Sequence, residues 1–263
     1  MPRDVWKSEE RADRGLIKEK DSDLFKTVEG VLDTSTVMVL YELENRGYFK
    51  KLLGVVSTGK EANIYWGVGD EREVAVKVYR TATLDFKKIW VYIVGDPRFF
   101  RFKKSTRGMM FIWAEKEFKN LKLAYEAGVR VPEPIVQHKN VLVMEFIGED
   151  GIPAPKIKDA KLSQQELKEA FEKIVDYVTK LYKKAELVHA DISEYNILWW
   201  DEPVLIDLSQ AVMLNHPLSQ EFLIRDLKNL LSYFSREGVK VPSLEELYYQ
   251  VTGEELPWKQ ENM

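Results

Sequence analysis

Residues 189–207 read HADISEYNILWWDEPVLID and carry the clearest structural pattern in this 263-residue sequence. Two apolar runs, ILWW and PVLI, flank Asp201 and Glu202, which predicts a β-hairpin with a two-residue turn. In that register Asn196 lies directly opposite Asp207, with Cβ atoms about 5 Å apart. Amide and carboxylate oxygens at that separation can share a divalent cation. We therefore expect Asn196 and Asp207 to bind Mg²⁺ or Mn²⁺ together with phosphate and water.

Asp191 precedes Asn196 by five positions, in a loop that returns to the same end of the hairpin. We expect it to act as a base, or to orient an attacking hydroxyl group, rather than to bind the metal. The alternative is that Asp191 and Asn196 only cap turns, which both residue types often do. For His189 we expect a structural role, in which the side chain holds the loop through hydrogen bonds to the backbone.

Outward from this hairpin, apolar spacing and turn residues divide the chain into a sheet-rich first half and a helical second half. The predicted elements of the first half are a helix at 33–47, an antiparallel meander at 48–58, 62–69 and 73–80, a helix at 113–128 and a strand pair at 133–147. Residues 81–112 show no clear pattern. Beyond the Gly- and Pro-rich stretch 148–156, helices are predicted to begin at Ser163, Ser219 and Ser243. We expect a ligand to bind between the two halves.

The composition excludes several kinds of chemistry and location. The chain has no cysteine and only three scattered histidines, so disulfides, thiol catalysis and zinc sites built from these residues are excluded. It contains no apolar run of about 18 residues, and the charged residues 1–15 lack the apolar core of a secretory signal. We therefore expect an intracellular protein without a membrane span. Because the net charge is −4, contact with nucleic acid would need a local basic patch.

Residues 54–61, GVVSTGKE, nearly match the phosphate-binding pattern GxxxxGK[ST]. Glu61 stands where that pattern needs a hydroxyl for magnesium, and the next residues alternate like a strand instead of opening a helix. Both departures argue against a Walker-type NTPase. Two other interpretations stay open. Residues 57–60, with Ser57 and Lys60, form either a flap that binds phosphate oxygens or an ordinary hairpin turn with a solvated lysine.

Three motifs resemble those of protein kinases. HADISEYN resembles the catalytic loop HRDLxxxxN, IDLSQ stands where kinases carry DFG, and VAVKVY resembles the strand with the nucleotide-binding lysine. The stretches STGKEANIYWG, HADISEYNIL and IDLSQAV are similar to the RIO family of atypical serine kinases. STGKEA in the phosphate loop and GDPRF before WAEKEF fit the type-one branch of that family, and the similarity covers residues 48–250.

The resemblance implies an α+β, bilobal protein-kinase-like fold. Its N-lobe would contain an antiparallel sheet with a long helix, and its reduced helical C-lobe would lack an activation segment and peptide-binding helices. The implied divisions are an N-terminal helical extension at 1–47, an N-lobe at 48–147 with an insert at 81–112, and a C-lobe at 148–263, with the hinge at 145–151.

The resemblance also implies roles for the candidate site residues. Lys77 would bind the α- and β-phosphates of ATP and pair with a glutamate of the long helix, for which we favour Glu117 over Glu115. The other implied roles are phosphate contact by Ser57 and Lys60, adenine contact by Met144 and by backbone groups of Glu145 and Ile147, proton acceptance by Asp191, and metal binding by Asn196 and Asp207. Asp207 is also implied as the acceptor of a phosphoryl group in an ATPase cycle.

Departures from ordinary kinases narrow the implied activity. The GxGxxG loop and the APE motif are absent, and Leu208 and Ser209 replace the Phe and Gly of DFG. Residues 208–263 are too few to build the usual peptide-docking platform, which favours autophosphorylation or ATP hydrolysis. We expect a serine/threonine kinase and ATPase that acts in maturation of the small ribosomal subunit. The alternatives are a non-catalytic, nucleotide-sensing ribosome-assembly module and a small-molecule phosphotransferase of kinase-like fold.

Basic and aromatic residues are interleaved between Arg80 and Arg107, a stretch that we call the basic segment. Its basic residues are Arg80, Lys87, Lys88, Arg98, Arg101, Lys103, Lys104 and Arg107, and its rings are Phe86, Trp90, Tyr92, Phe99, Phe100 and Phe102. Charge and stacking rings together can bind RNA, but the same pattern also suits a solvated segment whose rings pack on their own lobe. With the family resemblance, the first interpretation predicts contact with RNA or proteins of the pre-ribosomal small subunit in the cytoplasm. The oligomeric state stays open, with a monomer as the simplest case.

Overall fold

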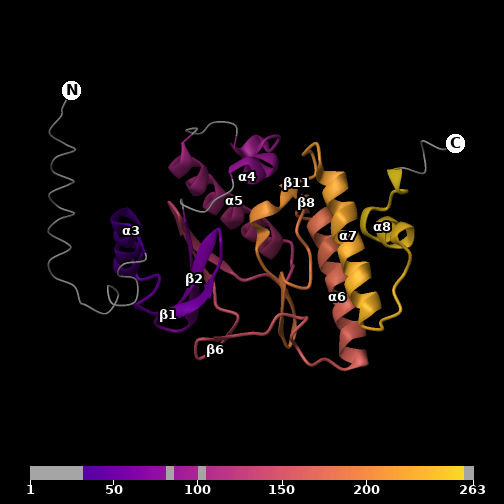
Figure 1. The fold of residues 1–263 in the computed structure, drawn as a ribbon, viewed down its shortest axis with the longest axis horizontal. Coiled ribbons are helices and arrows are strands. Elements are labelled where there is room, and N and C mark those ends of the chain that lie inside the picture. Colours follow the sequence, from indigo (N-terminus) through magenta and orange to yellow (C-terminus); the bar gives the residue numbers. More distant parts are fainter. Residues whose placement is uncertain (1–31, 81–85, 100–104, 258–263) are drawn as a thin grey trace.

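The computed structural model describes residues 32–80, 86–99 and 105–257 (Figure 1). Most of the helical extension predicted at 1–47 and part of the basic segment lie outside these residues. The described part of the extension is helix α3 (Thr34–Asn45), which Asp33 caps by accepting the Thr36 N–H at 3.0 Å. The helix predicted at 33–47 is therefore confirmed.

The predicted meander is the first part of a five-stranded antiparallel sheet. Its strands are β1 (Lys51–Thr58), β2 (Ala62–Val68), β3 (Glu73–Tyr79), β4 (Pro134–His138) and β5 (Val141–Glu145). The order across the sheet is β1-β2-β3-β5-β4, so β3 is the central strand. The meander and the strand pair predicted at 133–147 are both confirmed.

The central strand sends alternate side chains to two different layers. Val74 and Val76 pack with α3, whereas Ala75 belongs to the core that contains the long helix α5 (Thr106–Glu126). Figure 1 shows α3 and α5 on opposite sides of the sheet. Lys77 shares the α5 face by the same alternation. This is why a lysine on the central strand points toward α5 and the second half of the molecule.

The second half is mainly helical and contains short strand pairs. Its elements are β6 (Gly148–Glu149), β7 (Ile152–Pro153), α6 (Gln164–Lys183), β8 (Leu187–Val188), β9 (Ile197–Trp200), β10 (Glu202–Leu205), η2 (Leu208–Gln210), β11 (Val212–Met213), α7 (Ser219–Arg236) and α8 (Leu244–Thr252). The three predicted helix starts are confirmed, since Ser163 and Ser243 each form a capping box and α7 begins at Ser219. We call the sheet with α3 and α5 the N-lobe, and α6 to α8 with their connections the C-lobe. Among the helices of the described residues, none is long and apolar enough to cross a membrane.

Within 81–112, for which the sequence showed no pattern, the structure describes residues 86–99 and 105–112. Helix α5 begins at Thr106, earlier than the predicted start at 113, because Ser105 caps it by accepting the Gly108 N–H at 3.1 Å. Its first turns, MMFIW, are apolar all round and so hide the helical period. Before α5 lie helix α4 (Phe86–Ile93) and the short 3-10 turn η1 (Pro97–Phe99).

Helix α4 follows an N-lobe strand in the chain and contacts both α5, through the Tyr92 and Trp113 rings, and the C-lobe. His216 accepts the Leu218 N–H through Nδ1 at 3.1 Å, so its Nε2 carries the proton and donates to the Val91 carbonyl of α4 at 3.1 Å. Tyr92 of α4 stacks on Phe222 of α7, with the ring centroids 5.2 Å apart. These contacts join the start of α7 to the region between β3 and α5.

Two residues of the basic segment are held within the fold, Arg98 being partly buried and Phe99 buried. Arg98 forms an ion pair with the buried Asp96 at 2.6 Å, and only 19% of its side chain is exposed. The Phe99 ring is buried in the core. For these two residues the structure favours the second interpretation, in which the segment packs on its own lobe, because the Arg98 guanidinium is already paired within the fold.

The hairpin of β9 and β10 is confirmed, but its predicted register is wrong by one residue. Pro203 pairs with Trp199, and Leu205 pairs with Ile197. The difference arises at Asp201, which turns the chain alone in a left-handed conformation with a φ of 59°. A two-residue turn would have shifted each pair by one position.

Because of this shift, the partner of Asn196 is Ile206, whose N–H donates to the Asn196 carbonyl at 3.0 Å. Asp207 lies one position further along, where an extended chain would send its side chain to the other face. Asp207 instead adopts a left-handed conformation, with φ 61° and ψ 65°, which redirects the chain at this point. The side chains of Asn196 and Asp207 still line the same cavity, although they are not cross-strand partners.

Candidate active site

A cavity of about 610 Å³ lies between the sheet and the C-lobe. The residues with predicted roles in nucleotide or metal binding that line it are Ser57, Lys60, Lys77, Glu117, Met144, Glu145, Ile147, Asn196 and Asp207. Asp191 is not part of the lining and reaches the site through its hydrogen bond with Asn196. Residues from β1, β3, α5, β5 and the hairpin of the C-lobe thus meet around one space.

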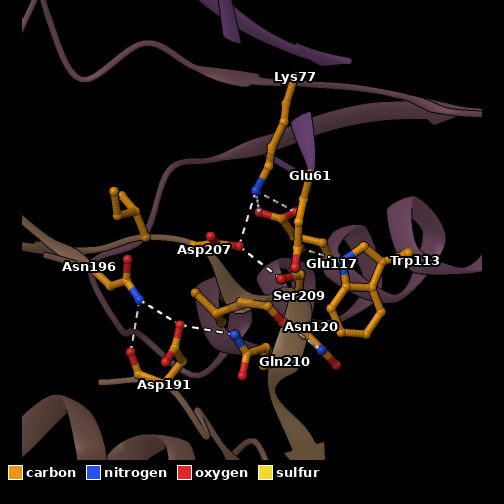
Figure 2. A network of polar contacts seen from close by, with 12 residues as sticks. Glu61, Lys77, Trp113, Glu117, Asn120, Asp191, Asn196, Asp207, Ser209 and Gln210 are labelled. Carbon is orange, nitrogen blue, oxygen red and sulfur yellow. Dashed lines mark hydrogen bonds and ion pairs between the residues drawn. The ribbon is translucent and has the colours of Figure 1, made fainter. Parts of the chain in front are cut away.

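Lys77 lies between two carboxylates from distant parts of the chain (Figure 2). Its Nζ is 2.8 Å from Glu117 Oε1 on α5 and 3.1 Å from Asp207 Oδ1 after β10. Burial alone would lower the pKa of Lys77, but Asp207 and Glu117 raise it above its usual value, so the ammonium stays charged. Glu115, the alternative partner, lies on the partly exposed side of α5 and pairs with Lys119 at 2.6 Å.

The carboxyl groups around this one ammonium give the site a surplus of negative charge. Burial raises the pKa of Glu61, that of Glu117 to about 7 and that of Asp191 to about 6, and the charge of Asp207 adds to each shift. Burial would also raise the pKa of Asp207, but Lys77 and a hydroxyl hydrogen bond hold it below its usual value. Asp207 is therefore the carboxylate that stays ionised, and the cluster as a whole favours a bound cation.

The donor atoms at this point fit a magnesium ion bound together with a nucleotide. Within residues 32–80, 86–99 and 105–257, no cluster of three or more His, Asp or Glu side chains could hold a metal alone. Asn196 directs its amide nitrogen to Asp191, which leaves its Oδ1 for a ligand. Asp207 uses Oδ1 for Lys77 and for the Ser209 hydroxyl, which leaves its Oδ2. Two such oxygens suit Mg²⁺, whose remaining ligands would be phosphate oxygens and water.

Asp191 is held by two amide side chains. Asn196 Nδ2 donates to its Oδ2 at 2.9 Å, and Gln210 Nε2 donates to the same oxygen at 3.0 Å (Figure 2). Its Oδ1 has no hydrogen-bond partner among the described residues. A carboxylate with a raised pKa and one free oxygen is suited to accept a proton from a hydroxyl group.

The apolar end of the cavity is lined by Ala75 and Met144, which are cross-strand partners on β3 and β5. The Glu145 N–H donates to the Glu133 carbonyl at 2.9 Å, so Glu145 can offer a ligand only its carbonyl. The Ile147 N–H has no hydrogen-bond partner in the described part of the chain. A flat apolar slot with one carbonyl and one free N–H at its edge has the shape and polarity that an adenine ring requires.

The turn between β1 and β2 forms the rim of the cavity. It is closed like an ordinary hairpin, with the Gly59 N–H donating to the Ala62 carbonyl at 2.9 Å, yet Ser57 and Lys60 also line the cavity. Glu61 ties the turn to α5 by accepting the Trp113 Nε1–H at 3.2 Å (Figure 2). The two interpretations of residues 57–60 are therefore compatible with each other.

Asp226, which no sequence motif marks, supports the loop at residues 189–196 that resembles a kinase catalytic loop. Asp226 of α7 is buried and accepts the N–H groups of Ala190 at 2.7 Å and Ile192 at 3.0 Å, on either side of the candidate base. Ala190 has a left-handed φ of 66°, which costs free energy and needs such support. The sequence did contain one indication of this role, since Asp226 lies four positions from both Phe222 and Leu230 and so falls on the apolar face of α7, where a carboxylate is unexpected.

The structural role expected for His189 is confirmed. Its ring is buried, and Nε2 lies 3.2 Å from the Ile206 carbonyl, which joins the catalytic loop to the end of β10. Burial lowers the pKa of His189 to about 4, so the ring is neutral at physiological pH.

Comparisons with known proteins agree with these features. The RIO domain family model matches residues 63–247. The RIO-type serine/threonine-protein kinase Rio1 of Methanocaldococcus jannaschii is 44% identical over 232 residues, which cover 88% of this chain and 79% of that protein. Rio1 of Haloferax volcanii is 41% identical, over 90% of this chain and 81% of that protein. Human serine/threonine-protein kinase RIO1 is 39% identical, but the match covers only 44% of its length.

Solved structures of two Rio2 kinase forms from Chaetomium thermophilum share the fold. The Rio2 kinase-ADP/Mg²⁺-phosphoaspartate complex has a TM-score of 0.62 at 20% identity, and covers 83% of this chain and 67% of that one. The other Rio2 structure has a TM-score of 0.58 at 21% identity, over 82% of this chain and 67% of that one. The predicted α+β, kinase-like fold is thereby confirmed. Since the family model and the Rio1 relatives both match most of its length, the chain belongs to the RIO family of serine/threonine-protein kinases and is of the Rio1 type.

Proposed function

We propose that this chain is an ATP- and Mg²⁺-dependent serine/threonine protein kinase. The observation that carries the proposal is the Lys77 ammonium, fixed between Glu117 and Asp207 beside two free oxygens of Asn196 and Asp207. The Rio1 relatives that match most of this chain are named as such kinases, and the Rio2 complex contains ADP and Mg²⁺. Mn²⁺ accepts the same oxygen ligands and is the alternative metal.

In this proposal each side chain has one task in transfer of the γ-phosphoryl group. Lys77 binds phosphate oxygens, and Asn196 and Asp207 hold the metal, which supplies charge neutralisation when it is bound. Asp191 accepts the proton of the attacking serine or threonine hydroxyl through its free Oδ1. The hydroxyl oxygen bonds to the γ-phosphorus as the bond to the bridging oxygen breaks, and ADP leaves with that electron pair. Positioning and charge stabilisation would provide most of the acceleration.

The remaining lining residues would bind the rest of the nucleotide. Met144 would lie against the adenine ring, while the Glu145 carbonyl and the Ile147 N–H bond to its edge. Ser57 and Lys60 would cover the phosphates from the rim of the cavity. We place the division between the lobes at 145–151, where β5 ends and the small hairpin of β6 and β7 begins.

We also propose ATP hydrolysis through a transient phosphoryl group on Asp207. Its Oδ2 has no partner among the described residues, and the Rio2 complex contains a phosphoaspartate. In this second reaction Oδ2 would attack the γ-phosphorus instead of binding the metal, which would form an acyl phosphate and release ADP. Water would then release phosphate and restore the carboxylate. Only residues 208–218 separate Asp207 from α7, which leaves little chain for docking a peptide and favours hydrolysis or autophosphorylation.

The basic segment supports a proposal about partners. Lys87 and Lys88 lie on the exposed side of α4, and the Trp90 ring beside them is 39% exposed. A ring flanked by ammonium groups suits stacking on RNA bases beside phosphates. We propose that this surface contacts RNA or proteins of the pre-ribosomal small subunit in the cytoplasm. Salt-sensitive RNA binding that survives Lys87→Gln with Lys88→Gln would count against it.

Incubation with γ-³²P-labelled ATP tests the proposed activity. We expect label on serine or threonine, or a base-labile acyl phosphate on Asp207, and we expect Asp191→Asn to reduce turnover by about 10²- to 10⁴-fold. Binding of ATP without any turnover would instead support the nucleotide-sensing module, and transfer only to a small molecule would support the phosphotransferase. Full turnover by Asp191→Asn would show that the role of Asp191 as base is wrong.

A further inference from the structure

The short turn η2 is held from one side by two side chains of α5. Lys116 Nζ donates to the Ser209 carbonyl at 3.2 Å, and Asn120 Nδ2 donates to the Leu208 carbonyl at 2.8 Å. Both side chains also donate to the Ala211 carbonyl. Lys116 and Asn120 are fully buried and lie one helical turn apart, so they form a single bonding face on α5.

These bonds meet a need of the turn itself. The turn is closed by one backbone bond, from the Ala211 N–H to the Leu208 carbonyl at 3.2 Å, and it leaves its later carbonyls to other donors. Buried carbonyls without partners are costly. The held segment also carries two contacts to the active site (Figure 2). The Ser209 hydroxyl donates to Asp207 Oδ1 at 2.8 Å, and Gln210 donates to Asp191 Oδ2 at 3.0 Å. The position of this segment therefore affects both the candidate metal ligand and the candidate base.

The region between β3 and α5 determines which way the Asn120 amide faces. Arg98 donates to Asn120 Oδ1 at 2.9 Å and to the two carboxylate oxygens of Asp96 at 2.9 and 2.6 Å. A guanidinium group can only donate, so the amide oxygen must face Arg98 and the amide nitrogen must face the carbonyls of the turn. A continuous set of contacts therefore runs from Asp96 through α5 to the residues after Asp207.

We propose that Lys116 and Asn120 are positioning residues for Asp207, and that the Asp96–Arg98 pair acts through Asn120. Neither Lys116 nor Asn120 lines the cavity, so neither would touch the nucleotide. Lys116 forms no ion pair with the described residues, and an apolar side chain would occupy the same space without burying a charge. Its ammonium group is explained by the carbonyls that it holds. The inference rests on the proposed function, in which Asp207 binds the metal of the nucleotide complex.

The test measures ADP binding by calorimetry, in EDTA and in Mg²⁺, for Lys116→Met and Asn120→Ala. Lys122→Met, at an exposed position of the same helix, is the matched control. In EDTA we expect both variants to bind ADP with the affinity of the wild type. The increase in ADP affinity on adding Mg²⁺ should be about 10- to 100-fold smaller than in the wild type, as is typical when support of a metal ligand is removed. The KM for ATP measured in Mg²⁺ should rise by a similar factor. Lys116→Met removes a buried charge but leaves the Ser209 carbonyl without this donor, so the melting temperature of each variant is recorded and ADP binding is measured well below it.

Coupling between variants separates positioning from general destabilisation. Introduced into the wild type, Arg98→Met should reduce the gain in ADP affinity from Mg²⁺ by a smaller factor. Introduced into Asn120→Ala, it should cause no further reduction, because Arg98 acts through Asn120. The proposal is overturned if Mg²⁺ increases the ADP affinity of both α5 variants as much as that of the wild type. It is also overturned if the variants melt at a lower temperature and bind ADP more weakly even in EDTA, because that would show general destabilisation. Wild-type protein whose ADP binding gains nothing from Mg²⁺ would instead overturn the proposed metal site, and this inference with it.

Discussion

Glu117→Gln should make the protein more stable at alkaline pH while it reduces activity. Glu117 is fully buried, and burial raises its pKa from 4.5 to about 7. The folded protein therefore binds a proton more tightly than the unfolded chain does, and stability is lost as pH rises from 4.5 to 7. A shift of this size corresponds to about 3 kcal/mol at pH 8, at ~1.4 kcal/mol per pKa unit. Glutamine keeps the shape and the acceptor oxygen but does not ionise.

Urea unfolding followed by tryptophan fluorescence at pH 5 and pH 8 measures this effect. The free energy of unfolding of Glu117→Gln, relative to the wild type, should rise by about 2–3 kcal/mol between the two pH values. Glu115→Gln, a change on the partly exposed side of the same helix, should show no such rise. Comparing variants at each pH cancels the titration of all other groups.

Activity should change in the opposite direction. Lys77 loses one of its two anionic partners in Glu117→Gln, and a charge-assisted hydrogen bond is worth about 1.5–3 kcal/mol, so kcat/KM should fall about 10- to 150-fold. A stability difference that does not change with pH, or that favours the wild type at pH 8, would refute the reasoning. It would show that the attraction between Lys77 and Glu117 outweighs the cost of burying the carboxylate.

Three further changes test other parts of the structure. Asp226→Asn should leave one backbone N–H of the catalytic loop unpaired and lower the free energy of unfolding, measured by urea titration, by about 1–3 kcal/mol. It should reduce turnover more than it reduces the ADP affinity measured by calorimetry. Gly151→Ala should cost about 1–3 kcal/mol more than Gly253→Ala, because both glycines have a positive φ but only at Gly151 would the new Cβ lie 2.6 Å from the Trp66 ring. Equal costs would show that backbone strain alone matters. For His189, whose pKa is lowered from 6.5 to about 4, the unfolded chain binds the proton, so stability falls by up to about 3 kcal/mol as pH drops through that window. His189→Gln should remove that part of the acid slope, and an unchanged slope would contradict the assignment.

The sequence was sufficient for elements whose pattern is local. Asp33, Ser163 and Ser243 cap helices through bonds to residues three positions later, and the meander strands follow their own alternation. The predicted register of the hairpin was wrong by one residue, because Asp201 adopts a left-handed conformation that the neighbouring residues do not indicate. Asn196 and Asp207 nevertheless line one cavity, for a reason absent from the prediction: the backbone turns sharply at Asp207.

The supporting contacts of the site could not be predicted because they join residues far apart in the chain. Lys116 and Asn120 bond carbonyls near residue 210, and Asp226 bonds the loop around Asp191. A backbone carbonyl has no sequence signature, so no motif marks its partner. The sequence could indicate only that Lys116 and Asn120 lie on the same face of the helix as the apolar Trp113, which is buried. Polar residues on an otherwise apolar helix face indicate a buried partner without identifying it.

Helix α4 follows β3 in the sequence but packs against α5 and α7, so its local unfolding should follow its packing partners and not its neighbour in the chain. Segments that are packed together open together, whatever their order along the chain. The amide hydrogens of α4 should therefore exchange with solvent at rates that follow α5 and α7, on which Tyr92 packs through Trp113 and Phe222, and not those of the adjacent strand β3. A ligand that slows exchange in α7 should slow it in α4 as well, so that a helix belonging to the first half of the chain reports on the rigidity of the second.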